Sequence, residues 1–182
     1  MQMYYETDRL ILRILHENSA AEVLDFFIRN KDIFERWEPD RPWNFYTREY
    51  QAAILKCEFE LVMKMNAVRF WIFLKESPDT LIGTVSFQNV MRSVFQSCCI
   101  GYKMDKDYQQ QGYATEAIST AISIIATEMG LHRIEAFVAP NNTPSIRLLE
   151  RLGFVYEGIR RSCIYLHSNW TDHLQYSFIC SD

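Results

Sequence analysis

The segment Asp107–Ala117 reads DYQQQGYATEA, and it places one glycine between a polar run and a helix-forming sequence. The first N–H groups of a helix have no partner inside the helix, and the helix dipole is positive at that end. Gly112 has no Cβ, so a ligand can approach the main chain closely there. We therefore expect the amides from Gln110 to Thr115 to point at a common spot and bind an anion, with the Thr115 hydroxyl as a further donor.

The glycine pattern also limits the kind of anion. The sequence contains neither the G-x-x-x-x-G-K-[ST] loop of nucleoside triphosphatases nor the G-x-G-x-x-G turn of dinucleotide-binding domains. It therefore favours a diphosphate that is not part of a nucleoside triphosphate. The alternative that these residues leave open is a solvated turn in front of an ordinary helix.

The elements that would position this turn follow from the spacing of apolar residues. Period-two patterns predict strands at 9–15, 68–74, 80–90, 97–104, 133–139, 154–160 and 172–180. Period-3.6 patterns with start and stop signals predict helices at 17–29, 47–65, 114–129 and 145–152. This order predicts an α/β (α+β) fold, in which one mixed, mostly antiparallel sheet of six to seven strands carries helices on both faces.

Composition sets the class of protein. Apolar residues make up 48% of the 182 residues and charged residues 23%, which suits one globular domain that covers residues 1–182. The net charge of −4 argues against non-specific binding to nucleic acid. No apolar stretch is long enough to span a membrane, and the N-terminus does not resemble a signal peptide, so we expect a cytoplasmic protein without a membrane partner.

The cysteines and histidines do not suggest a metal site. The five cysteines show no C-x-x-C spacing, and we expect free buried thiols in a reducing compartment; they are Cys57, Cys98, Cys99, Cys163 and Cys180. The four histidines form no zinc-binding pattern with them, so no metal is expected. Cys98 and Cys99 are adjacent and should face opposite sides of a strand, where no base would activate either thiol.

The spacing Gln109-x-x-Gly112-x-Ala114 resembles the Q/R-x-x-G-x-G/A signature of the GNAT superfamily of N-acetyltransferases, whose turn receives the pyrophosphate of coenzyme A. The longer segments IGYKMDKDYQQQGYATEA and LHRIEAFVAPNNTPSIRLLERLGFVYEGIRR are similar to the RimJ/RimL-type branch, the ribosomal-protein-alanine N-acetyltransferases, as is the opening TDRLILR. The resemblance covers nearly the whole chain. It implies the GNAT fold, in which the strands at 97–104 and 133–139 are parallel and splay apart at a bulge.

This resemblance also assigns roles to residues. Backbone groups at the splay would bind the pantetheine arm of acetyl-CoA, the turn would bind its pyrophosphate, and Asn142 would reach the cofactor. Ser145 would be the catalytic residue, because it would sit near the thioester sulfur and hydrogen-bond the leaving thiolate. The implied cofactor-binding residues are Tyr102, Lys103, Met104, Gln109, Gln110, Gln111, Gly112, Tyr113, Ala114, Thr115, Asn142 and Ser145.

Alternatives remain open at several of these positions. The Tyr102 side chain could serve only in strand packing, and Ser145 could merely lie in the first turn of a helix capped by Asn142 or Thr143. The sequence also departs from the wider superfamily twice. Leu149 stands where many relatives carry a proton-donating tyrosine, and Gln110 replaces a common glycine of the turn, which is tolerable if its backbone has helix-entry geometry.

The implied reaction is direct transfer of acetyl to an amine. Trp37 and Glu38 are the expected substrate-binding residues, and Glu38 and Asp40 are candidates for a base or else solvated loop charges. Trp43, Phe45 and Tyr46 form either an apolar wall for the substrate or a lid packed on the core. His132 is expected to be structural.

The acceptor implied by the branch is the N-terminal α-amine of a protein or peptide, such as a ribosomal protein. Its amine is neutral to roughly 10–20% at pH 7, so it needs little help from a base. The alternatives are a small amine, such as a polyamine, an amino acid or an aminoglycoside, and a non-catalytic sensor of coenzyme A. Acidic residues clustered in the acceptor cleft would favour a polycation. The oligomeric state is expected to be a monomer or a homodimer.

Overall fold

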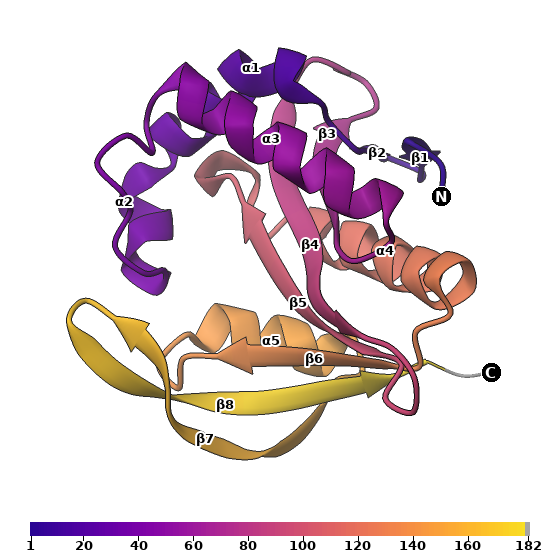
Figure 1. Ribbon diagram of the computed structural model, residues 1–182, viewed down its shortest axis with the longest axis vertical. Coiled ribbons are helices and arrows are strands. Elements are labelled where there is room, and N and C mark those ends of the chain that lie inside the picture. The colour runs from indigo at the N-terminus through magenta and orange to yellow at the C-terminus, as the bar shows by residue number, and fades with distance from the viewer. Residues whose placement is uncertain (181–182) are drawn as a thin grey trace.

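The computed structural model describes residues 1–180 of the chain, and it contains one twisted sheet of eight strands with helices on both faces (Figure 1). The spatial order of the strands is β1-β2-β3-β4-β5-β6-β8-β7. Their bounds are β1 Tyr4–Glu6, β2 Leu10–Arg13, β3 Val68–Leu74, β4 Leu81–Met91, β5 Ser97–Met104, β6 Arg133–Val138, β7 Val155–Leu166 and β8 Asn169–Ile179. All neighbours are antiparallel except β5 and β6.

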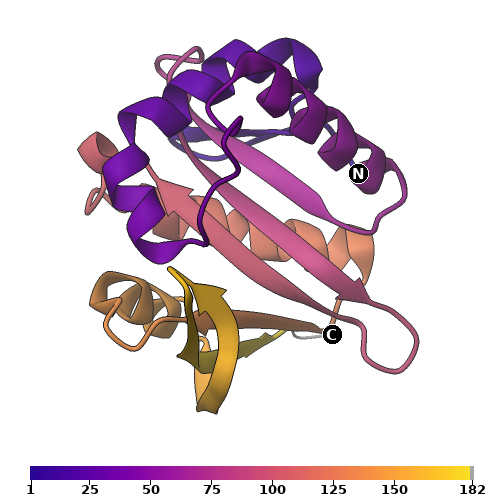
Figure 2. The same ribbon diagram turned by 60° about the vertical axis from the view of Figure 1, so that its left-hand side comes forward.

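The helices form two layers, and each layer covers its own part of the core. Helices α1 (Ala20–Arg29) and α3 (Arg48–Met63) lie on one face, and α4 (Tyr113–Met129) lies on the other, as Figure 2 shows. The short helices are α2 (Lys31–Phe34) and α5 (Thr143–Arg151), with single turns η1 (Glu17–Ser19), η2 (Glu35–Trp37) and η3 (Lys106–Tyr108). The layers pack against side chains that alternate along the strands. On β3, for example, Phe70 faces the core under α4, whereas Trp71 faces the core under α1.

Local signals explain where the two helices near the expected site begin and end. Helix α4 begins after Gly112 and ends at Gly130, and both glycines have left-handed backbone conformations. Helix α5 begins after Asn142, whose side chain accepts a hydrogen bond from the Ser145 N–H at 3.3 Å, and Pro144 lies in its first turn. Both helix starts had been predicted from these residue types.

The sheet has one more strand than the six to seven expected. The additional strand, β1, is only three residues long, which is too short for a period-two pattern to identify it. It pairs with β2, and the Tyr5 hydroxyl donates a hydrogen bond to Glu128 on α4 at 2.8 Å. The C-terminal hairpin is also longer than predicted, because pairing resumes after an irregular stretch between Arg160 and Ile164.

The cysteines are free, as predicted, but only Cys98 and Cys180 are buried. Cys57 is exposed on α3, so the expectation that all five would be buried was wrong. Cys98 points into the core and burial raises its pKa to about 12, so this thiol stays protonated at neutral pH. Within residues 1–180, none of the helices combines the length and the hydropathy needed to cross a membrane.

Candidate active site

The site is built where β5 and β6 separate. The two strands are paired only at Ser97–Arg133, Cys98–Ile134 and Cys99–Glu135. Beyond that point β5 continues to Met104 against β4 alone, and β6 continues against β8. The edge of β5 that faces β6 therefore has no strand partner from Ile100 onward (Figure 1). The predicted parallel pair and its splay are present, and the bulge implied at the splay stays a prediction.

The glycine turn follows directly after the free end of β5. The first helical hydrogen bond of α4 runs from the Glu116 N–H to the Gly112 carbonyl at 3.1 Å. The N–H groups of Tyr113, Ala114 and Thr115 therefore precede the helical ladder and remain available to a ligand. Gly112 has φ of 84°, and a Cβ built there would meet only one atom within 4 Å, the Nη2 of Arg9 at 3.2 Å. These features fit the diphosphate that the sequence predicted.

The backbone at Gln110 differs from what the sequence suggested. Its φ is 59°, which is a left-handed conformation and not helix-entry geometry. Glycine adopts this conformation without steric cost, whereas a residue with a Cβ is strained there by about 1–2 kcal/mol. The turn tolerates Gln110 in spite of this strain. Side-chain bonds to the main chain stabilise the turn on either side, from Gln109 to the Met104 carbonyl at 3.2 Å and from Gln111 to the Asp107 carbonyl at 2.9 Å.

Arg9, which lies about 100 residues before the turn, stabilises it through contacts that no local sequence signal predicts. Its Nη1 donates to the Gln111 carbonyl at 3.1 Å, its Nε donates to Glu116 Oε2 at 2.8 Å, and its guanidinium lies 4.5 Å from the centre of the Tyr113 ring. Burial alone would raise the pKa of Glu116, but hydrogen bonds from Thr7 and Arg9 outweigh burial and hold this pKa below its ordinary value. Glu116 is therefore ionised, and it connects the segment that leads into β2 to the first turn of α4.

Tyr102 and Ser145 meet on the face of β5 that α4 and α5 cover. The Tyr102 hydroxyl lies 2.7 Å from Ser145 Oγ and 3.4 Å from the Ser145 carbonyl oxygen. Burial raises the pKa of Tyr102 to about 12, so the phenol keeps its proton at neutral pH. Leu149, the position of the superfamily's tyrosine, is a buried core residue. A tyrosine hydroxyl thus does lie beside Ser145, but it comes from β5 and not from α5.

Lys103 points to the opposite face of β5. Its Nζ lies 2.5 Å from Glu38 Oε1, and the other carboxylate oxygen of Glu38 pairs with Arg41. Glu38 and Trp37, the two predicted substrate-binding residues, stand at the end of η2, and Trp37 is partly buried under Arg36. The structure therefore brings Glu38 next to the free segment of β5.

The remaining loop residues divide between core and surface. Phe45 is buried among the aromatic residues under α1, so it belongs to the core and not to a wall for substrate. Trp43 is 94% exposed. Asp40 is 72% exposed and pairs with His167 Nδ1 at 3.0 Å, so its carboxylate is solvated and bound to the turn between β7 and β8, as expected for a loop charge.

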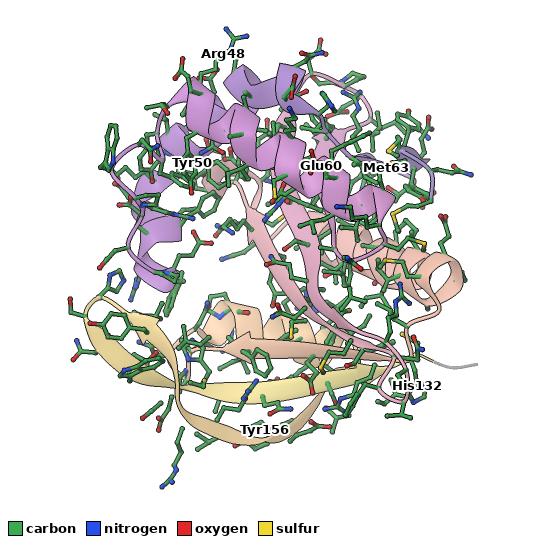
Figure 3. All side chains as sticks on the ribbon, in the orientation of Figure 1. Arg48, Tyr50, Glu60, Met63, His132 and Tyr156 are labelled. Carbon is green, nitrogen blue, oxygen red and sulfur yellow. The ribbon has the colours of Figure 1, made fainter. Side chains whose placement is uncertain are left out.

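His132 and the acidic residues add no further reactive group. Figure 3 shows His132 beside the start of β6, at the end where β5 and β6 are still paired. Its main chain joins the loop before β5 to the C-terminal strand, since its N–H donates to the Gln96 carbonyl and its carbonyl accepts from Cys180. Among residues 1–180 there is no group of three or more histidine, cysteine, aspartate or glutamate side chains that could hold a metal ion.

The comparisons with known proteins all find acetyltransferases. The profile of the Acetyltransferase (GNAT) domain matches residues 9–155. The chain is 37% identical over 164 residues to the probable N-acetyltransferase YjcK of Bacillus subtilis, with 90% of each chain covered. It superposes with a TM-score of 0.93 and 31% identity on the ribosomal-protein-S5-alanine acetyltransferase of Vibrio fischeri, over 100% of this chain and 98% of that one. RimJ of Mycobacterium smegmatis in complex with CoA-disulfide is similar over 93% of this chain and 81% of that one, with a TM-score of 0.86 and 26% identity.

Proposed function

Because the chain belongs to the GNAT family of acetyltransferases, and its relatives include ribosomal-protein-alanine N-acetyltransferases of the RimJ/RimL type, we propose that it acetylates a protein N-terminus. The donor in this proposal is acetyl-CoA, and the acceptor is the α-amine of a protein such as a ribosomal protein. The observation that carries the proposal is the free segment of β5, which has one pair of polar side chains on each face. We infer as well that residues 1–182 form a single N-acetyltransferase domain in the cytoplasm.

The residues present fit coenzyme A. The free edge of β5 from Tyr102 to Met104 offers main-chain hydrogen-bond partners to the pantetheine amides. The unpartnered amides at the start of α4 suit the pyrophosphate, and the absence of a Cβ at Gly112 leaves the approach open. RimJ of Mycobacterium smegmatis, a structural neighbour, forms a complex with CoA-disulfide, which supports coenzyme A as the ligand in this chain.

Acetyl transfer requires a proton donor or hydrogen-bond donor beside the thioester sulfur. The acceptor amine attacks the thioester carbonyl, a C–N bond forms, the C–S bond breaks, and the thiolate needs a proton or a hydrogen-bond donor. If the Tyr102 hydroxyl donates to Ser145, the Ser145 O–H is free to point at the sulfur. Ser145 is therefore proposed as the group that assists the leaving thiolate, and Tyr102 as the residue that orients its hydroxyl. A strand N–H near Tyr102 would stabilise the oxyanion.

The charges on the other face favour an α-amine over a polycation. The side chains beside the free segment of β5 are Lys103, Arg41 and Arg69, with Glu38 and Glu58 as their only carboxylate partners. Negative charge does not exceed positive charge in this cluster, even though burial lowers the pKa of Lys103 to about 7. The cluster therefore offers no surplus of carboxylates that would attract a polyamine or an aminoglycoside, whereas an α-amine carries at most one charge.

The test compares matched peptides. Peptides with ribosomal-protein N-termini are prepared with a free or a formylated α-amine, and each contains one internal lysine. Purified protein is incubated with acetyl-CoA and each peptide, or with spermidine, free alanine or an aminoglycoside. Thiol release and the mass of the product are measured. Thiol release that requires the free α-amine is the expected result.

Other outcomes would replace the proposal. Release with small amines and not with peptides would assign the enzyme to small-molecule acetylation. Binding of coenzyme A without release for any amine would favour a sensor.

A further inference from the structure

A cavity of about 460 Å³ lies between the segment that joins η2 to α3 and the turn between β7 and β8. This volume is within the range of about 300–1000 Å³ that ligand pockets have. Asp40 of the segment and His167 of the turn both line the cavity, and their contact at 3.0 Å joins its two walls (Figure 1). Within the described residues, no other hydrogen bond or ion pair links this segment to the β7–β8 hairpin.

The lining of the cavity contains a tryptophan, a tyrosine and an arginine, which are Trp43, Tyr46 and Arg41. These three residue types are enriched among the side chains that contribute most of the energy of protein interfaces. Trp43 is 94% exposed, although tryptophan is highly buried on average. Its ring therefore contributes almost no apolar burial to the fold, and a ligand that covered the ring would bury that surface.

The segment that carries these side chains is held in place by its own hydrogen bonds. The Phe45 N–H donates to the Pro42 carbonyl at 2.9 Å, and the Thr47 hydroxyl donates to the Asn44 carbonyl at 2.8 Å. From α3, Gln51 Nε2 donates to the Phe45 carbonyl at 2.7 Å. This wall of the cavity is thus formed before a ligand arrives, which lowers the entropy that binding would cost.

Arg41 connects the cavity to the free segment of β5. It lines the cavity, and its guanidinium lies 4.1 Å from the centre of the Phe45 ring. The same guanidinium pairs with Glu38, whose other carboxylate oxygen lies 2.5 Å from Lys103 Nζ on β5. A continuous series of contacts therefore leads from the free segment of β5 to the cavity. An extended polypeptide advances about 3.3 Å per residue, so a chain whose N-terminus lies at β5 can reach the cavity within a few residues.

We propose that this cavity is a subsite for the acceptor polypeptide, and that it receives the residues that follow the acetylated one, with Trp43 as their anchor. This inference rests on the proposed function and defines its acceptor more closely. The acceptor is an unfolded N-terminal segment that carries an apolar or aromatic side chain within its first few residues. Trp43 and Tyr46 offer ring surface to such a side chain. A small amine cannot lie at β5 and fill the cavity at the same time, so the subsite favours polypeptides.

The charges around the cavity favour an apolar side chain over a charged one. The two cationic side chains of the lining, Lys31 and Arg41, are matched by two carboxylates, Glu35 and Asp40. Several of these charges already contact neighbours: the Tyr46 hydroxyl donates to Glu35 at 2.8 Å, and Lys31 Nζ lies 4.8 Å from the centre of the Tyr46 ring. Neither a cation nor an anion would therefore meet an excess of opposite charge in the cavity.

The kinetic test uses peptides that begin with the same residue: a dipeptide, an octapeptide with phenylalanine at its third and fourth residues, and the same octapeptide with glycine there. The wild-type kcat/KM should be highest for the phenylalanine octapeptide. In Trp43→Ala, kcat/KM for this peptide should fall by roughly 10- to 30-fold through a higher KM, and its advantage over the glycine octapeptide should disappear. Since Trp43 is 94% exposed, its truncation should not affect folding.

Trp170→Ala is the matched control, because it removes another exposed tryptophan, 65% exposed, that does not line the cavity. It should keep the wild-type preference for the phenylalanine octapeptide. A second measurement needs no turnover. In protein that contains 5-fluorotryptophan, the fluorine NMR signal of Trp43 is assigned by its absence from Trp43→Ala. The α-acetylated phenylalanine octapeptide, added with coenzyme A, should shift this signal and leave that of Trp170 in place.

The failures of the two proposals are distinguishable. If the wild-type enzyme acetylates α-amines with equal kcat/KM for the two octapeptides, or if Trp43→Ala keeps the wild-type preference, the subsite is overturned and the proposed function stands. An unmoved Trp43 signal at saturating peptide overturns the subsite as well. A wild-type enzyme that acetylates no α-amine overturns the proposed function itself.

Discussion

Gly112→Ala should weaken coenzyme A binding far more than it weakens the fold. The change puts a Cβ on a residue with φ of 84°, a left-handed conformation that costs a residue with a side chain about 1–2 kcal/mol. The new Cβ would lie 3.2 Å from Arg9 Nη2, the far end of a flexible side chain that can move aside. We therefore expect the free energy of unfolding to fall by about 1–2 kcal/mol, nearly all of it from the backbone conformation.

The effect on the ligand has a different origin. The Cβ would stand between the unpartnered amides of α4 and a diphosphate. The loss of one hydrogen bond to a charged group costs about 1.5–3 kcal/mol, which corresponds to an affinity roughly 10- to 100-fold lower. Gly112→Glu would add a negative charge at the same place and should weaken binding further than the uncharged Gly112→Gln.

Gly130→Ala is the matched control for this experiment. Gly130 ends the same helix with φ of 62°, and a Cβ there would meet nothing within 4 Å. Urea denaturation should show a similar loss of stability in the two alanine variants, and calorimetry with coenzyme A should show lower affinity only in Gly112→Ala. Equal affinities of the two variants would refute the placement of the diphosphate at this turn.

Three further predictions concern the site and its support. Ser145→Ala should lower kcat about tenfold or more with the KM for peptide unchanged, and Tyr102→Phe should cause a smaller loss in the same direction; equal kinetics of Ser145→Ala and wild type would remove the serine from the mechanism. Asp105→Asn should destabilise the fold by about 1–3 kcal/mol at pH 7, because it removes the buried carboxylate that accepts from the buried Asn30 amide and the exposed Arg29, and the urea curves of the variant and wild type should converge as pH falls below 3.8. Gln110→Gly should leave the free energy of unfolding within about 1 kcal/mol of the wild-type value, because the relief of left-handed strain is offset by the greater flexibility of the unfolded chain. A large loss of stability in urea denaturation would show that the Gln110 side chain stabilises the turn.

The pH dependence at Asp105 follows from the sign of its pKa shift. Burial raises the pKa of this carboxyl, but hydrogen bonds from Asn30, Arg29 and the Asp107 N–H outweigh burial and leave the pKa below its ordinary value. The folded state therefore binds the proton less readily than the unfolded chain does. The stabilisation by Asp105 is complete above the pKa that its carboxyl has in the unfolded chain. It is lost as pH falls through the lower pKa that the carboxyl has in the folded protein.

The parts of the site that depend on local sequence could be predicted. Gly112 and Asn142 act on the residues next to them, as a helix start and as a cap, so their roles can be inferred from a few residues on either side. The parting of β5 and β6 was predicted through resemblance to a family, and the structure confirms it.

The parts that depend on long-range contacts could not be predicted. Tyr102 and Ser145 are separated by 43 residues, and Arg9 and Gln111 by 102. Whether such pairs meet depends on the register of the sheet and on where the helices lie over it. From the sequence, strand packing and a role at the site are equally good predictions for Tyr102. Gln110 shows a different limit, since its left-handed conformation is rare for a residue with a side chain, although the bonds that stabilise the turn come from the adjacent Gln109 and Gln111.

The alternation of side chains along a strand explains how β5 can present different groups on its two faces. Consecutive side chains of a strand point to opposite faces, so Tyr102 turns toward α5 and Lys103 turns toward η2. The proposed reaction needs a hydrogen-bond donor on the thiolate side, which Tyr102 and Ser145 can provide, and Lys103 with its partner Glu38 lies on the opposite face of the same strand. The main chain between them is unpaired on its β6 side, so the thioester can lie across the strand between the two groups. A shift of β5 by one residue would exchange these faces, which is why the pairing of β5 with β4 is as important to this chemistry as the side chains themselves.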